Sequence, residues 1–180
     1  MGESGSSLTS ARASRIASSI LPSGRRKNKA RLLAGTLISA GRYDEAASQC
    51  EKLPADFVFT SECLGRAWLG QGKTAEAIRV LATASSWGYL AYAYARAGRR
   101  DEVERLAADA PLTRPHTHGW FQYALVYAGL QDKDRTVDAL ERWAGVGPVR
   151  MGFTLNAPEF AFVRGDPRVK ALRKKVGLPE

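Results

Sequence analysis

The chain has 180 residues, a formal net charge of +9 and 44% hydrophobic residues, which suits one globular domain that buries a core without covalent staples. No apolar stretch approaches the roughly 20 residues that a membrane-spanning helix needs. The positive charge lies in the tails, since residues 1–29 carry a net +5 and residues 159–180 a net +3. The region between them is almost neutral, so we expect no basic stripe of the kind that tracks nucleic-acid phosphates.

Residues 1–29 are rich in Ser, Arg and Lys and poor in large apolar side chains, which is typical of a disordered leader or linker. An acid-poor, Ser- and Arg-rich N-terminus is equally typical of an organellar transit peptide, and both interpretations stay open. Residues 1–20 lack the continuous apolar region of a secretory signal, so export is not expected. We therefore expect a cytoplasmic protein, or an organellar one if the leader is a targeting signal.

A helical hairpin pattern recurs four times between residues 30 and 148: an apolar helix, a Gly-bearing turn and a second apolar helix. Each first helix carries a small residue followed three positions later by a bulky one. The small residues are Ala34, Gly65, Ala91 and Ala124, and the bulky ones are Leu37, Trp68, Tyr94 and Tyr127. A small side chain lets the partner helix approach while the bulky one fills the adjacent space, so this pairing predicts close helix packing.

These hairpins resemble the tetratricopeptide repeat, whose pattern runs W-x2-L-G-x2-Y followed by small and aromatic residues. The resemblance covers roughly residues 30–145 and implies an all-α fold, an α-solenoid of about four hairpins over residues 30–148. Residues 127–134 and 166–172 are similar to the final repeats and tail of repeat domains attached to bacterial winged-helix regulators and serine/threonine kinases. The spacing between the bulky residues varies, and it predicts a shortened second hairpin.

The C-terminal segment, residues 149–180, is expected to cap the last hairpin. Asp166 and Pro167 form a typical helix start, with Asp as the N-cap and Pro at the first helical position. Val169, Leu172 and Val176 then follow at helical spacing and predict an apolar stripe. A stacked repeat needs such an element, because its last hairpin would otherwise expose a core-facing surface.

No arrangement of residues indicates catalysis, a cofactor or a metal site. Cys50 and Cys63, the two cysteines, fall among apolar helical positions, where we expect unreactive structural thiols in a reducing compartment. His116 and His118 lie two apart in a Pro-bounded loop, and two imidazoles do not complete a zinc site. We expect a protein that is not an enzyme.

The resemblance implies that the first helix of each hairpin lines a concave groove. The expected partner-binding residues are Arg31, Glu62, Arg66, Tyr92, Arg96 and Phe121, and further inward positions are Ile38, Leu69 and Leu125, with His118 at the rim. Guanidinium groups grip carboxylates and aromatic rings offer contact area at little entropic cost, so such a groove suits an extended or helical peptide with acidic and apolar side chains. Alternatively, the Arg side chains are merely solvated and the rings pack between repeats.

The predicted function is that of a protein-interaction adaptor or scaffold, which would suit a role in signalling. One alternative is a structural subunit of a larger, possibly organellar, assembly. A weaker alternative is nucleic-acid binding through the basic tails. The partner and the oligomeric state do not follow from the sequence.

Overall fold

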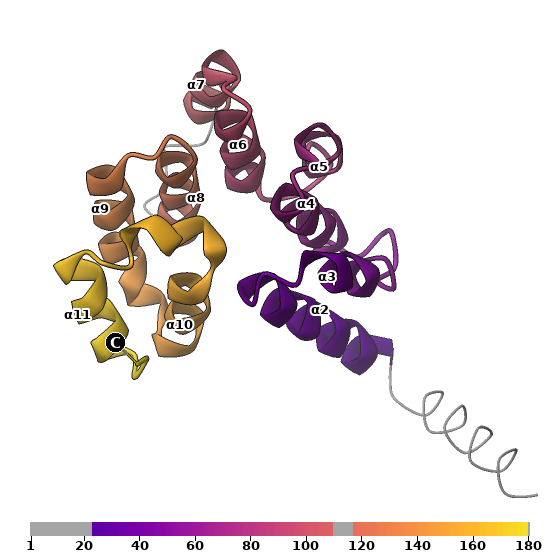
Figure 1. Ribbon diagram of the computed structural model, residues 1–180, viewed down its shortest axis with the longest axis horizontal. Helices are drawn as coiled ribbons and strands as arrows, with labels where there is room; N and C mark the ends of the chain where they lie inside the picture. Colours follow the sequence, from indigo (N-terminus) through magenta and orange to yellow (C-terminus); the bar gives the residue numbers. More distant parts are fainter. Residues whose placement is uncertain (1–22, 110–116, 180) are drawn as a thin grey trace, which may run out of the picture.

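The computed structural model describes residues 23–109 and 117–179, and the prediction of an all-α protein is confirmed for these ranges, which contain no strand (Figure 1). None of the described helices is both long and apolar enough to cross a bilayer. The α-helices are α2 (Ser23–Ser39), α3 (Tyr43–Cys50), α4 (Thr60–Gly70), α5 (Thr74–Leu81), α6 (Trp87–Arg96), α7 (Arg100–Asp109), α8 (Thr117–Gly129), α9 (Lys133–Trp143), α10 (Pro148–Asn156) and α11 (Pro167–Lys175). Two short 3-10 helices, η1 (Ala144–Val146) and η2 (Pro158–Val163), flank α10.

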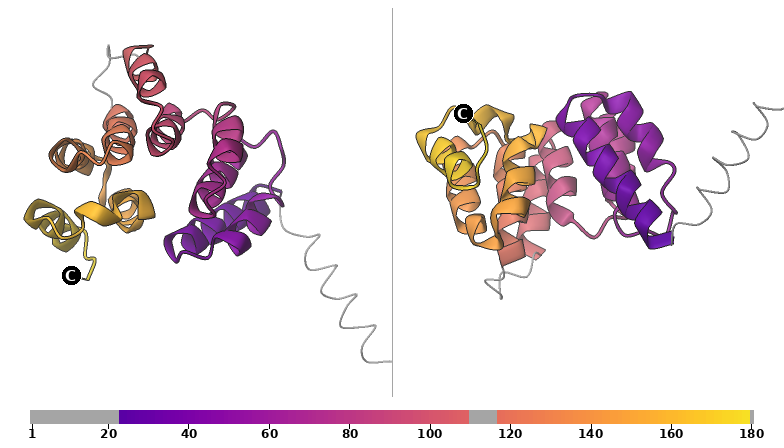
Figure 2. Two further views of the ribbon diagram at one scale, coloured as in Figure 1. Left: turned by 45° about the horizontal axis from the view of Figure 1, so that its top comes forward. Right: turned by 90° about the horizontal axis from the view of Figure 1, so that it is seen from below.

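The first eight of these helices form four hairpins arranged along an arc: α2 with α3, α4 with α5, α6 with α7, and α8 with α9 (Figures 1 and 2). The first helices of successive hairpins contact one another, α2 with α4, α4 with α6 and α6 with α8. These first helices line what we call the inner wall of the arc. The arrangement brings residues from separate hairpins together on one surface.

The four hairpins turn in the same way. Gly41, Gly72 and Gly98 adopt φ angles of 72°, 77° and 74°, and Gln131 occupies the equivalent position with a φ of 58°. In each turn the next residue donates its backbone N–H to the carbonyl of the bulky residue of the first helix, at 2.8–2.9 Å. Glycine enters this left-handed conformation without steric cost, which explains its presence in three of the four turns.

The small residues of the first helices mark close approaches between helices, as the sequence predicts. Ala34, Ala91 and Ala124 are fully buried, and a methyl group on Gly65 would collide with the side chain of Leu81 in α5. Gly88 in α6 is also packed tightly, because a methyl group there would lie 2.8 Å from the Cα atom and 2.9 Å from the carbonyl oxygen of Gln122 in α8. Backbone atoms cannot move aside as the end of a side chain can.

We therefore expect Gly88→Ala to lower the free energy of unfolding by about 1–3 kcal/mol, since the added methyl overpacks the α6–α8 contact. Gly35→Ala is the matched control, because Gly35 lies in α2 with nothing within 4 Å of the position of its missing Cβ. The control is expected to be neutral or stabilising by up to about 1 kcal/mol, from helix propensity alone. Urea denaturation measures both, and equal values for the two variants would contradict this description of the packing.

The N-terminal boundary differs from the sequence-based one. Helix α2 begins at Ser23, so residues 23–29, which composition places in the leader, belong to a helix. The reason is that this segment follows Pro22 and four of its seven residues are Arg or Lys, residues of good helix propensity. Residues 1–22 and His116 lie outside the described residues, as does the side chain of His118.

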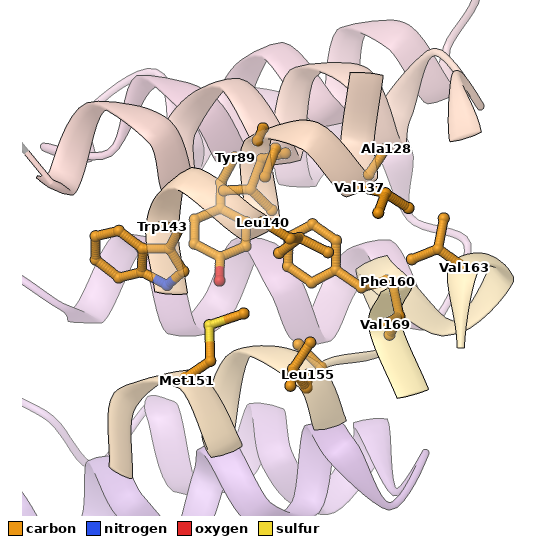
Figure 3. Close-up of a cluster of buried hydrophobic side chains, with 14 of the residues drawn as sticks. Tyr89, Ala128, Val137, Leu140, Trp143, Met151, Leu155, Phe160, Val163 and Val169 are labelled. Atoms are coloured by element: carbon orange, nitrogen blue, oxygen red, sulfur yellow. The ribbon is translucent and has the colours of Figure 1, made fainter. Parts of the chain in front are cut away.

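The C-terminal segment does more than cap the last hairpin. Helix α11 begins as predicted, with Asp166 as an N-cap that accepts a hydrogen bond from the backbone N–H of Arg168 at 2.9 Å, and it packs against α9 and α10. Met151, Leu155, Phe160 and Val163 are buried in the main core together with residues of α8 and α9 (Figure 3). Helix α10 and η2 are therefore an integral part of the fold, and η2 lies on the inner wall.

The core is unequally distributed along the arc. The main cluster runs from Ala77 in α5 to Val169 in α11 and includes every large aromatic side chain that is nearly fully buried in the described residues. The first hairpin has only two small clusters, one around Ile38 and one around Cys50, with several alanines. Because apolar burial scales with side-chain size, the N-terminal hairpin has less hydrophobic stabilisation than the rest of the chain.

Candidate functional site on the inner wall

An ion pair links α4 to η2 across the inner wall. The Nε and Nη2 atoms of Arg66 donate to the two carboxylate oxygens of Glu159 at 2.8 and 3.1 Å. Only 14% of the Arg66 side chain and 6% of the Glu159 side chain are exposed. The guanidinium also lies over the ring of Tyr89, 4.9 Å from its centroid. Paired geometry of this kind is how a guanidinium recognises a carboxylate.

Arg66 stands between two cavities on this wall. The larger, which we call the central cavity, has a volume of about 300 Å³ and is lined by Tyr43, Arg66, Leu69, Gly70, Gly72, Thr74, Tyr92, Arg96, Pro158 and Glu159. The smaller, the N-terminal cavity, has a volume of about 60 Å³ and is lined by Arg31, Gly35, Ile38, Phe59, Glu62, Cys63 and Arg66. Because both cavities include Arg66, they form adjoining parts of one surface from α2 to α6.

The structure brings five of the six expected binding residues to these cavities. Arg31, Glu62 and Arg66 line the N-terminal cavity, and Arg66, Tyr92 and Arg96 line the central one. Phe121 lies elsewhere, with its ring 5.4 Å from that of Trp143 and 6.3 Å from that of Phe160, measured between centroids. Its ring does not lie in an open groove as expected, because it packs, half-buried, against one ring of α9 and one of η2 at the edge of the main core. Leu125 is fully buried in the same core.

The polar groups of the central cavity are mainly hydrogen-bond donors. Burial, together with the charge of Glu159, raises the pKa of Tyr92 to about 12, so its phenol keeps the proton at neutral pH. Arg96 is exposed and forms no ion pair or hydrogen bond with the described part of the chain. Burial lowers the pKa of the Arg66 guanidinium, but the charges of Glu159, Tyr89 and Glu62 and the hydrogen bonds to Glu159 together outweigh burial, so the net change is upward. A carboxylate entering this cavity would meet protonated donors.

Glu159 and Pro158 are site residues that sequence reasoning did not assign. The available signal is an acidic residue inside an otherwise apolar run, Pro158 to Val163, because a buried carboxylate requires a partner. That signal indicates a pair without identifying the partner, which lies 93 residues away. Phe59 was also missed, although its ring supports the guanidinium of Arg31 at 5.0 Å.

Cys50 and Cys63 form a disulfide between the end of α3 and the first turn of α4, with their Cα atoms 5.7 Å apart. The expectation of two free thiols is therefore wrong. Helix α4 docks beside the end of α3 so that both side chains enter the same small cluster. The bond ties the first hairpin to the helix that carries Glu62 and Arg66.

Within residues 23–109 and 117–179, no group of three or more His, Cys, Asp or Glu residues is placed to hold a metal ion. The inner-wall cavities hold charged, phenolic and apolar groups suited to reversible binding. Comparison with known proteins finds no family model, no curated protein and no solved structure that matches the chain.

Proposed function

We propose that the chain is a non-enzymatic protein-interaction module of the tetratricopeptide type, an adaptor or scaffold that binds a peptide with acidic side chains on its inner wall. The main observation in support is the Arg66–Glu159 pair. In this pair, an arginine on the inner wall already binds a carboxylate of the chain itself through two hydrogen bonds. The repeated left-handed turns after Leu37, Trp68, Tyr94 and Tyr127 support the repeat interpretation.

The position of η2 restricts the proposed binding surface to the N-terminal half of the inner wall. Because Phe121 packs against Phe160 of η2 and Leu125 is buried in the core, the surface open to a partner is that of the two cavities between α2 and α6. Arg66 is already engaged by Glu159, so Arg96 and Tyr92 are the donors left for an incoming carboxylate in the central cavity. Leu69 and Tyr43 supply apolar contact area beside them.

The test is a selection of random displayed peptides on the immobilised chain, followed by affinity measurement with labelled peptides. We expect enrichment of Asp and Glu, and binding about 10- to 100-fold weaker to a Tyr92→Phe, Arg96→Ala variant, as expected for the loss of charge-assisted hydrogen bonds. Arg66 is left unchanged in this variant, because its removal would leave Glu159 buried without a partner.

The matched control is Arg79→Ala, which removes an arginine from α5; this side chain is 76% exposed and lines neither cavity. This control should bind the selected peptides as the wild type does. Peptides without acidic enrichment, or an affinity that is the same in all three proteins, would show that the proposed surface does not bind acidic peptides.

A further inference from the structure

The N-terminal cavity contains a hydrogen-bond donor that the chain does not satisfy. The Nε atom of Arg31 is buried and has no hydrogen-bond partner among the described residues. Stacking of its guanidinium over Phe59, at 5.0 Å from the ring centroid, helps to hold this group in place. A buried donor without an acceptor is unfavourable, and the residue that carries this one lines a cavity.

The same cavity is also lined by a carboxylate, that of Glu62, which is half-buried. Glu62 forms no hydrogen bond or ion pair with the described part of the chain, although Arg31 and Arg66 lie close enough to act on its charge. Burial raises the pKa of its carboxyl group, because the surroundings solvate the anion poorly. Arg66 acts on Glu62 through its charge only, since its hydrogen bonds go to Glu159. The cavity therefore offers one guanidinium group as donor and one carboxylate group as acceptor.

Charge decides which group complements this pair. A carboxylate would accept from Arg31 but meet the like charge of Glu62, and an ammonium group would donate to Glu62 but meet the like charge of Arg31. A primary carboxamide is neutral and carries an acceptor oxygen and a donor nitrogen side by side. The cavity, at about 60 Å³, is large enough for such a small polar group.

We propose that the N-terminal cavity binds the side-chain carboxamide of an Asn or Gln residue, with its oxygen on Arg31 and its nitrogen on Glu62. This inference deepens the proposed function and rests on it, because the amide would belong to the peptide whose acidic side chain enters the central cavity. The peptide would then be recognised in two adjoining cavities, through an acidic side chain in the central cavity and a neutral carboxamide in the N-terminal cavity.

The test uses three small probes of similar size: propionamide, propionate and propylammonium. Each is titrated into the isotopically labelled full chain while the backbone amide signals of Gly35 and Cys63 are followed by NMR. Propionamide is expected to give saturable shifts, with the two charged probes binding at least about tenfold more weakly because each meets a like charge. Equal binding of the three probes, or no saturable response to propionamide, would overturn the inference.

Two variants distinguish recognition from a structural effect. Glu62→Gln removes the negative charge while keeping the shape, so propionate should now bind at least as well as propionamide. Arg31→Met removes the donor and should abolish the response to both probes, whereas Arg79→Ala should behave as the wild type. An unchanged preference for propionamide in Glu62→Gln would contradict the assigned contacts.

The outcome is separable from that of the proposed function. If acidic peptides bind but propionamide does not, only the carboxamide inference fails. If propionamide binds selectively while acidic peptides do not respond to changes at Tyr92 and Arg96, the small site stands and the peptide-binding proposal fails.

Discussion

Replacing Arg66 by Met is expected to lower the free energy of unfolding by about 3–5 kcal/mol, the largest effect among the substitutions considered. The reason is that Glu159 would remain 94% covered, as judged from the 6% exposure of its side chain, with its charge unpaired. Methionine keeps most of the aliphatic volume of arginine, so the loss reports the missing charge and hydrogen bonds. Urea denaturation followed by tryptophan fluorescence measures the change.

The control is the double variant Arg66→Met, Glu159→Gln, which removes both charges. It should recover a large part of the lost stability, because a neutral amide is far less costly to bury than an unpaired carboxylate. Arg79→Met, at an exposed position, should change the stability by no more than about 0.5 kcal/mol. A single Arg66→Met variant as stable as the wild type would mean that the contact between α4 and η2 does not hold the C-terminal segment in place.

Replacing both cysteines by Ala is expected to lower the free energy of unfolding by about 3 kcal/mol. The disulfide joins residues 13 apart in sequence, and closing a loop of about this length removes entropy of that magnitude from the unfolded chain. The effect should be pronounced here because the first hairpin is held by two small clusters that consist largely of Ala, Leu and Cys. Denaturation of the oxidised protein and of the double variant gives the difference.

A dithiol reductant provides the independent control for this prediction. It should destabilise the wild type by a similar amount and leave the double Ala variant unchanged. If the reductant has no effect on the wild type, or the same effect on both proteins, the Cys50–Cys63 bond does not contribute to stability in solution.

Helical periodicity was sufficient to predict several features of the fold. The positions of the turns follow from glycines that can adopt a left-handed conformation, and the start of α11 follows from Asp166 and Pro167. The resemblance to the tetratricopeptide repeat implied that Arg31, Glu62 and Arg66 lie on one surface, and all three line the N-terminal cavity. These features depend on local backbone geometry, which local sequence specifies.

The candidate site was predicted less completely. Helical periodicity predicts on which face of its helix a residue lies, but it does not predict which other segment of the chain packs over that face. Phe121 was expected in an open groove, but the ring of Phe160 approaches it from a segment nearly 40 residues further along the chain. Cys63 was expected to be a free thiol, and its pairing depends on how closely α4 docks beside α3. Contacts between distant segments depend on the summed packing of the whole chain.

The sequence by itself determined that the described chain is helical and where its hairpins turn, because both depend on neighbouring residues. Only the tertiary structure decided that η2 lies on the inner wall, that Glu159 neutralises Arg66, and that Arg31 and Glu62 are left facing a small cavity without partners. The physical reason is that burial and pairing of charges depend on distance in space, and α4 and η2, whose paired residues lie 93 positions apart in the chain, come into contact only after the chain has folded.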